Sequence, residues 1–150
     1  MSKRADGENI GAALAEVREV YAALAHRPIE RNCTRKTECC HFKLTGRTPY
    51  LTKGEAIAAA KALRATGRKA LPQNSAEACP MLQPGTGHCL VYDDRPFGCR
   101  THFCSAAGGP VARRDVLDLI RRLEEVDSQL HGTGPRIFQH AIAEALELLS

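Results

Sequence analysis

Residues 79–104 read CPMLQPGTGHCLVYDDRPFGCRTHFC, and this stretch decides what fold the chain is expected to adopt. It contains four of the seven cysteines, and proline and glycine interrupt its short apolar runs. A segment of this length without helix or strand periodicity is uncommon in a compact domain unless it is functional or held together by other bonds. We therefore expect an irregular segment that is ordered by a metal ion bound to its sulfur atoms.

All the cysteines are candidate metal ligands: Cys33, Cys39, Cys40, Cys79, Cys89, Cys99 and Cys104. An odd number of cysteines without an export signal argues against a secreted disulfide framework. The chain is therefore expected to be cytoplasmic, where clustered thiols more often bind metal or carry out redox chemistry. No Cys-x-x-Cys pair is present, which disfavours a zinc ribbon and a thioredoxin-like site.

The neighbours of the cysteines add further candidates. Three histidines lie beside cysteines and are possible additional metal ligands: His41, His88 and His102. Lys36, Arg95 and Arg100 are close to cysteines in the sequence, and cations stabilise bound thiolates. Thiolates bind zinc or an iron–sulfur cluster. We favour zinc, because histidine is uncommon as a cluster ligand, and keep an iron–sulfur cluster as the alternative.

Helices are expected at both ends of the chain. Apolar residues at spacings of three and four predict an N-terminal helix over 8–26. Two apolar stripes in 111–149, separated by a Gly-Thr-Gly-Pro break, predict a helical hairpin that packs on the first helix. A further helix should start at a capping box formed by Thr52 and Glu55 and should end at Gly67.

These segments predict a mainly α fold and one small domain over residues 1–150. Helices at the two ends surround an irregular, cysteine-rich centre, residues 31–104, that a metal holds together. No apolar run approaches the roughly 18 residues that a membrane-spanning helix needs, so no membrane association is expected.

The charge distribution allows a second interpretation of the function. The formal net charge is +4, and residues 26–69 carry eleven Lys and Arg against three acidic residues. Such a stretch is typical of a nucleic-acid or ribosome-associated module. Bound thiolates would balance much of this charge, and the chain has no Trp for base stacking. The first alternative to a metal-binding protein is an iron–sulfur redox enzyme or accessory factor, and the second alternative is a nucleic-acid or ribosome-associated module.

The motifs resemble a bacterial cysteine-cluster family, the CxxCxxCC family of zinc- or iron-chelating domains. Its second block has the forms Cys-Pro-x-Leu, Cys-x-Val/Ile-Tyr and Arg-Pro-x-x-Cys-Arg, followed by a last cysteine. This chain matches with Cys79-Pro80-Met81-Leu82, Cys89-Leu90-Val91-Tyr92, Arg95-Pro96-Phe97-Gly98-Cys99-Arg100 and Cys104. The resemblance covers about residues 31–104 and implies metal chelation without fixing the metal.

The first block of the family motif is incomplete in this chain. Residues 33–40 read CTRKTECC, with Lys36 at the position of the second cysteine. Two four-sulfur sites need eight thiolates, so a histidine completes the second site or only one site forms.

Overall fold

The computed structural model describes residues 3–27, 50–67, 91, 94–101 and 112–149. Most of these residues form helices, which confirms the expected mainly α fold. The elements are α1 (Lys3–Ala25), β1 (Tyr50–Leu51), α3 (Lys53–Ala65), α4 (Phe97–Thr101), η4 (Arg113–Asp115), α5 (Leu117–Gln129), β2 (Arg136–Ile137) and α6 (Phe138–Leu149).

Helix α1 is longer than the apolar periodicity predicts. It begins at Lys3 instead of residue 8 and ends at Ala25 instead of residue 26. The apolar stripe marks only the packed part of the helix, because burial begins at Ala13 and Leu14 and Ile10 is partly buried. The helix begins with Lys3, Arg4 and Ala5, which favour helix without needing a packing partner.

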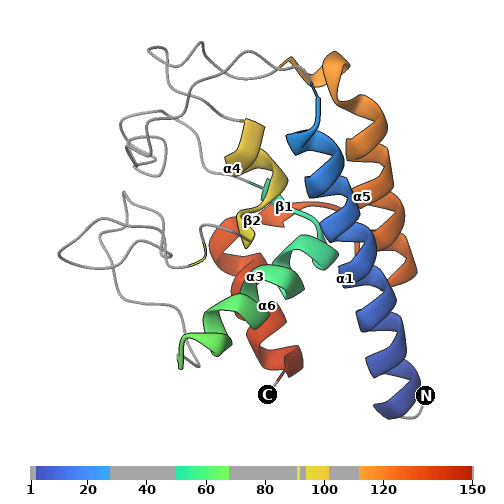
Figure 1. Cartoon of the computed structure of the whole chain (residues 1–150). Coiled ribbons are helices and arrows are strands. Elements are labelled where there is room, and N and C mark those ends of the chain that lie inside the picture. The colour runs from blue at the N-terminus through green and yellow to red at the C-terminus, as the bar shows by residue number, and fades with distance from the viewer. Residues whose placement is uncertain (1–2, 28–49, 68–90, 92–93, 102–111, 150) are drawn as a thin grey trace, which may run out of the picture.

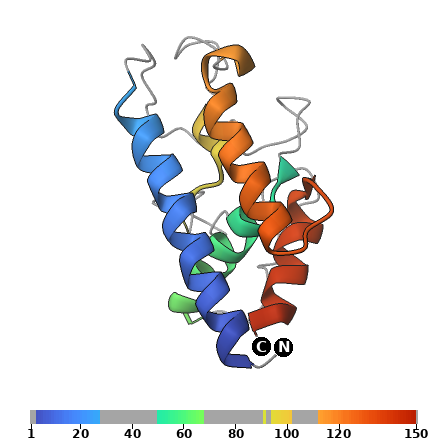
Figure 2. The same cartoon turned by 90° about the vertical axis from the view of Figure 1, so that its right-hand side faces the viewer.

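Helices α1 and α5 lie side by side and run in opposite directions (Figures 1 and 2). Their facing stripes are buried, with Val17 and Val20 on α1 and Leu119 and Val126 on α5. At the edge of this interface, Arg122 Nε of α5 donates to Glu16 of α1 at 2.6 Å. The two helices therefore pack through apolar contacts and are bridged by an ion pair at the rim.

Helix α3 has the start and the end that the sequence predicts. Thr52 and Glu55 form the capping box, and Glu55 Oε2 accepts the Thr52 N–H at 3.1 Å. Beyond Ala65 the chain turns through Gly67, whose φ of 90° suits glycine because it has no Cβ. Both local predictions for this helix are confirmed.

Helix α3 is the central helix of the described fold, and it contacts α1, α5 and α6. Its small residues allow this close packing: Gly54, Ala56, Ala58, Ala59 and Ala60 are all buried. A Cβ added at Gly54 would lie 2.7 Å from Val126 Cγ1 and 3.1 Å from Val17 Cγ2. The absence of a side chain at Gly54 therefore lets α1, α3 and α5 meet.

The substitution Gly54→Ala should lower the free energy of unfolding by about 1–3 kcal/mol, because the added methyl group overpacks this junction. Gly11→Ala is the matched control, since Gly11 is an exposed residue of α1 and a Cβ there would meet nothing within 4 Å. The control should raise stability by about 0.5–1 kcal/mol through helix propensity. Urea unfolding followed by circular dichroism measures both; equal effects would contradict the packing at Gly54.

The C-terminal helices differ in packing from the expected hairpin on α1. Helix α5 packs mainly on α1, whereas α6 packs mainly on α3. The turn after α5 leads into β2, which pairs with β1 in an antiparallel register of Tyr50 with Ile137 and Leu51 with Arg136. This pairing places α6 beside α3. Ile137 is apolar and fits the second of the expected stripes, but it lies in β2 and is 39% exposed.

Candidate metal centre

Of the predicted metal ligands, the structure describes Cys99. The other candidates and one predicted charge-balancing residue lie outside the described residues: Cys33, Cys39, Cys40, Cys79, Cys89, Cys104, His41, His88, His102 and Lys36. Within the described part of the chain, no group of three His, Cys, Asp or Glu side chains is arranged to hold a metal ion. The geometry that can be described is therefore that around Cys99.

Cys99 lies on α4, a helix that the sequence did not predict, because the segment 79–104 was expected to be irregular. The Pro96 carbonyl accepts the N–H groups of Cys99 and Arg100 at 3.0 and 3.1 Å, which closes the first turn. Pro96 and Phe97 are buried and fix this end of the helix against the core. Before α4, Val91 lies in a turn, and its carbonyl accepts the Asp94 N–H at 2.9 Å.

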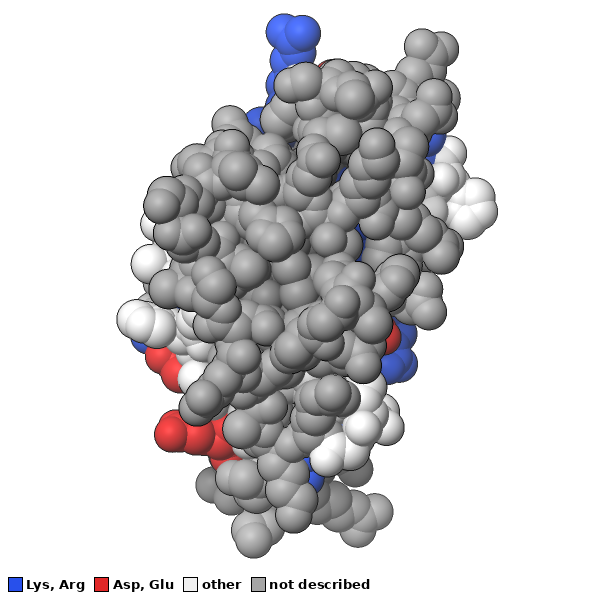
Figure 3. All heavy atoms as spheres, turned by 90° about the vertical axis from the view of Figure 1, so that its left-hand side faces the viewer, with Lys and Arg blue, Asp and Glu red and all other residues white. Residues whose placement is uncertain are grey.

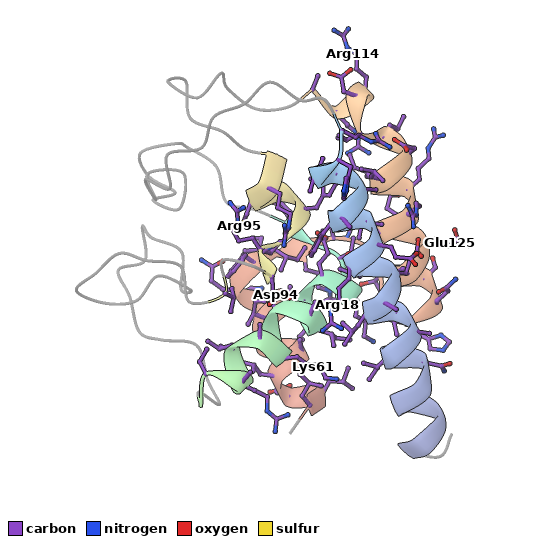
Figure 4. The ribbon with its side chains drawn as sticks, in the orientation of Figure 1. Arg18, Lys61, Asp94, Arg95, Arg114 and Glu125 are labelled. Carbon is purple, nitrogen blue, oxygen red and sulfur yellow. The ribbon has the colours of Figure 1, made fainter. Side chains whose placement is uncertain are left out.

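Helix α4 lies beside the C-terminal half of α1, on the side away from α5 (Figure 1). Figure 4 shows Asp94 and Arg95, just before α4, on the opposite side of the molecule from Glu125 of α5. The Arg100 guanidinium lies over the Tyr21 ring, 4.1 Å from its centroid, and Arg100 Nε donates to the Arg95 carbonyl at 2.7 Å. A cation over an aromatic face is attracted by the ring quadrupole. These two contacts fix the position of the Arg100 side chain, one residue after Cys99.

Cys99 is half-buried and interacts electrostatically with both Arg100 and Tyr21. Burial lowers the pKa of Arg100, and the electrostatic interactions with Tyr21 and Cys99 act in the opposite direction. Burial also raises the pKa of Tyr21 well above its usual range, and the negative charges of Glu55 and Cys99 raise it further. Positive charge from Arg100 therefore lies where it stabilises a thiolate at Cys99.

Glu55 is the residue beneath α4 whose part in this region the sequence did not reveal. It is 3% exposed, and its Oε1 accepts the Phe97 N–H at 2.7 Å and the Tyr21 hydroxyl at 3.3 Å. Burial raises the pKa of Glu55, although hydrogen bonds from Phe97, Thr52 and Tyr21 oppose this shift. From the sequence, Glu55 is expected only to cap the helix that begins after Thr52. A buried tyrosine hydroxyl needs a polar partner, so Tyr21 is the sequence feature that indicates a buried hydrogen-bond acceptor here.

The chemistry around Cys99 fits a thiolate metal ligand. Thiolate is a soft ligand that suits zinc and iron–sulfur clusters. Its negative charge needs compensation when it is partly buried, and the Arg100 guanidinium is electrostatically coupled to Cys99. Among the described residues, Cys99 is the one that would hold such a metal, and Arg100 and Tyr21 are its charged and polar surroundings.

Some of the basic residues in the stretch 26–69 form hydrogen bonds and ion pairs within the fold. Arg27 forms an ion pair with Asp118 and also donates to the Asp115 carbonyl at 3.0 Å. Lys53 Nζ donates to the Leu130 carbonyl at 2.8 Å, and Arg64 donates to the Leu149 carbonyl. On the face shown in Figure 3, the Lys and Arg side chains of the described residues lie apart and form no continuous patch. Nucleic-acid binding remains an untested prediction.

The comparison with family models assigns the chain to a class. Residues 32–126 match the family model "CxxCxxCC: Putative zinc- or iron-chelating domain", so the chain belongs to this family. The matched range includes all seven cysteines and extends into α5, beyond the range in which the motifs resemble the family. Family membership supports metal binding by this chain. No curated protein and no solved structure gives a significant match. None of the described helices is both long and apolar enough to cross a membrane.

Proposed function

We propose that the chain binds zinc through cysteine thiolates and that the bound metal orders its central segment. The match of residues 32–126 to the zinc- or iron-chelating family carries this proposal. The position of Cys99 beside the Arg100 guanidinium supports it, because this arrangement stabilises the metal-binding form of cysteine.

The proposed ligands are the seven cysteines, with one histidine completing the set if two four-ligand sites form. Lys36 occupies a position at which the family motif has a cysteine, so sulfur alone does not fill two tetrahedral sites. His41, His88 and His102 are the candidates for the missing ligand. Lys36, Arg95 and Arg100 are the proposed charge-balancing residues.

An iron–sulfur cluster is the second candidate, since the family description names iron as well as zinc. Elemental analysis and an optical spectrum of anaerobically purified protein distinguish the two metals. We expect zinc and a spectrum without visible absorption. Iron, together with a brown colour and an absorption band at about 400 nm, would show that the protein binds an iron–sulfur cluster instead of zinc. Protein that contains neither metal would contradict the proposed function.

The substitution Cys99→Ser should lower the metal content of the purified protein, because a neutral hydroxyl is a much poorer ligand for these metals than thiolate. It should also lower the melting temperature, since metal that binds only the folded state stabilises it. Ile142→Val is the control: Ile142 is fully buried on α6, and the change costs about 0.5–1.5 kcal/mol without altering a metal ligand. Metal content that falls equally in both variants would contradict ligation by Cys99.

A further inference from the structure

The Glu55 carboxylate joins the starts of two helices. Its Oε2 accepts the N–H and the hydroxyl of Thr52, at 3.1 and 2.9 Å, and so caps α3. Its Oε1 accepts the N–H of Phe97, the first residue of α4, at 2.7 Å. The Tyr21 hydroxyl of α1 donates to the same oxygen at 3.3 Å. One buried side chain therefore connects α4 to α1 and α3.

Helix α4 depends on such contacts because it has five residues. An isolated helix shorter than about 12 residues is marginal in water, because too few hydrogen bonds repay the ordering of the chain. Burial of Phe97 pulls α4 against the core but fixes its orientation only loosely, since apolar packing is not directional. The hydrogen bond to Glu55 is directional. It sets where the backbone of α4 begins and therefore where Cys99, two residues later, is held.

We propose that Glu55 is a positioning residue for the metal site: it holds α4 so that Cys99 and Arg100 are arranged to receive the metal. Glu55 acts on Cys99 through the α4 backbone and on Arg100 through Tyr21. This inference rests on the proposed function, because it assumes that Cys99 binds the metal. Glu55, which caps α3, would then also affect the metal affinity of a site on α4.

Asp127 provides a matched control for Glu55. It is 4% exposed, and it also contacts the start of α3, with Oδ1 accepting the Lys53 N–H at 2.7 Å. Its Oδ2 accepts the N–H of Gly134 at 2.9 Å, in the turn that follows α5. Both carboxylates therefore bridge the start of α3 to a second segment by backbone hydrogen bonds. The second segment contains α4 in one case and the turn after α5 in the other.

The paired substitutions are Glu55→Gln and Asp127→Asn. An amide keeps one acceptor oxygen and replaces the other by an NH₂ donor, so it cannot accept hydrogen bonds on both sides. Each variant therefore loses one side of its bridge, and both should be less stable than the wild type. Of the two variants, Glu55→Gln is the one that acts on the anchorage of α4, because its single acceptor oxygen must then be shared between the N–H groups of Thr52 and Phe97. A binding-competent conformation that is populated less often lowers the apparent affinity in proportion.

The experiment measures the affinity of the reduced, metal-free full chain for Zn²⁺ by competition with a chromogenic chelator, and records the thiolate–Co²⁺ absorption bands. We expect Glu55→Gln to bind Zn²⁺ about 10- to 100-fold more weakly, as is typical when an outer-shell partner of a metal site is lost. Its Co²⁺ bands should also change. Asp127→Asn should keep the wild-type affinity and bands despite its lower stability. Equal losses of affinity in the two variants would overturn the proposal.

Amide hydrogen exchange at Phe97 provides a readout that does not depend on metal. The Phe97 N–H should exchange faster in Glu55→Gln than in the wild type and should be unaffected in Asp127→Asn. Wild-type protein that binds no Zn²⁺ but shows this difference contradicts the proposed function, and leaves the anchorage of α4 by Glu55 intact. Equal Zn²⁺ affinities of the wild type and Glu55→Gln would contradict the positioning role of Glu55 and leave the proposed function intact.

A milder pair of variants applies if Glu55→Gln does not fold. Tyr21→Phe removes the hydroxyl donor on the α4 side of Glu55 and leaves the ring beneath Arg100. Thr52→Val removes the hydroxyl donor on the α3 side. We expect Tyr21→Phe to weaken Zn²⁺ binding and Thr52→Val to leave it unchanged. The reverse order, or no effect of either change, would overturn the proposal.

Discussion

Removing the metal from the purified protein with a strong chelator should produce the largest loss of stability expected for this chain. Structural zinc contributes on the order of 10 kcal/mol of binding free energy, and this becomes folding free energy where no preformed site exists. The loss here should be several kcal/mol and smaller than that limit, because α1, α3, α5 and α6 bury an apolar core of their own.

The effect should be concentrated at α4. Backbone amides of Cys99 and Arg100, which bond to the Pro96 carbonyl, should lose protection from hydrogen exchange when the metal is removed. Amides in the middle of α1 and α5 should stay protected to a greater extent. Thermal unfolding and hydrogen exchange before and after chelation, with restoration by added Zn²⁺, measure this. A melting temperature and a protection pattern that chelation leaves unchanged would contradict a structural metal.

The second large effect is expected from Phe138→Ala, which should destabilise the protein by about 3–5 kcal/mol. Phe138 is 1% exposed at the start of α6 and belongs to the apolar core. Its loss leaves a cavity and removes apolar surface from the contact between α6 and the rest of the core. A total stability of about 5–15 kcal/mol is normal for a domain, so this is a substantial fraction.

Ile137→Ala is the control for Phe138→Ala, because the two residues are adjacent and Ile137 is 39% exposed. The control should change stability far less. Neither residue is a predicted metal ligand, so the metal content of both folded variants should equal that of the wild type. Urea unfolding and elemental analysis test this pair. A loss for Ile137→Ala as large as that for Phe138→Ala would contradict the observed start of α6.

Local sequence signals predicted the helices because their causes are local. The Thr52–Glu55 capping box and Gly67 lie within or beside the helix that they delimit, and the apolar stripes of α1 and α5 identify their buried faces. Local signals do not predict the different burial of the adjacent residues Ile137 and Phe138. Both fit the apolar stripe, but the pairing of β2 with β1, far away in the sequence, exposes one and leaves the other buried.

Helix α4 and its anchorage could not be predicted from neighbouring residues. Five residues are too few to show a helical period, and the acceptor for the Phe97 N–H is Glu55, 42 residues earlier. Glu55 also satisfies a complete local explanation as a helix cap, so nothing in its own segment signals a second role. Composition and spacing predicted that the cysteines are metal ligands. Apart from Cys99, the proposed ligands lie outside the described residues, so their assignment stays a prediction.

X-ray absorption at the edge of the bound metal tests the shared sulfur site most directly. For the anaerobically purified wild type we expect sulfur atoms as the main neighbours, at about 2.3 Å if the metal is zinc. Cys99→Ser should reduce the sulfur contribution and Ile142→Val should leave it unchanged. A first shell made only of nitrogen and oxygen atoms would contradict metal binding by the clustered cysteines.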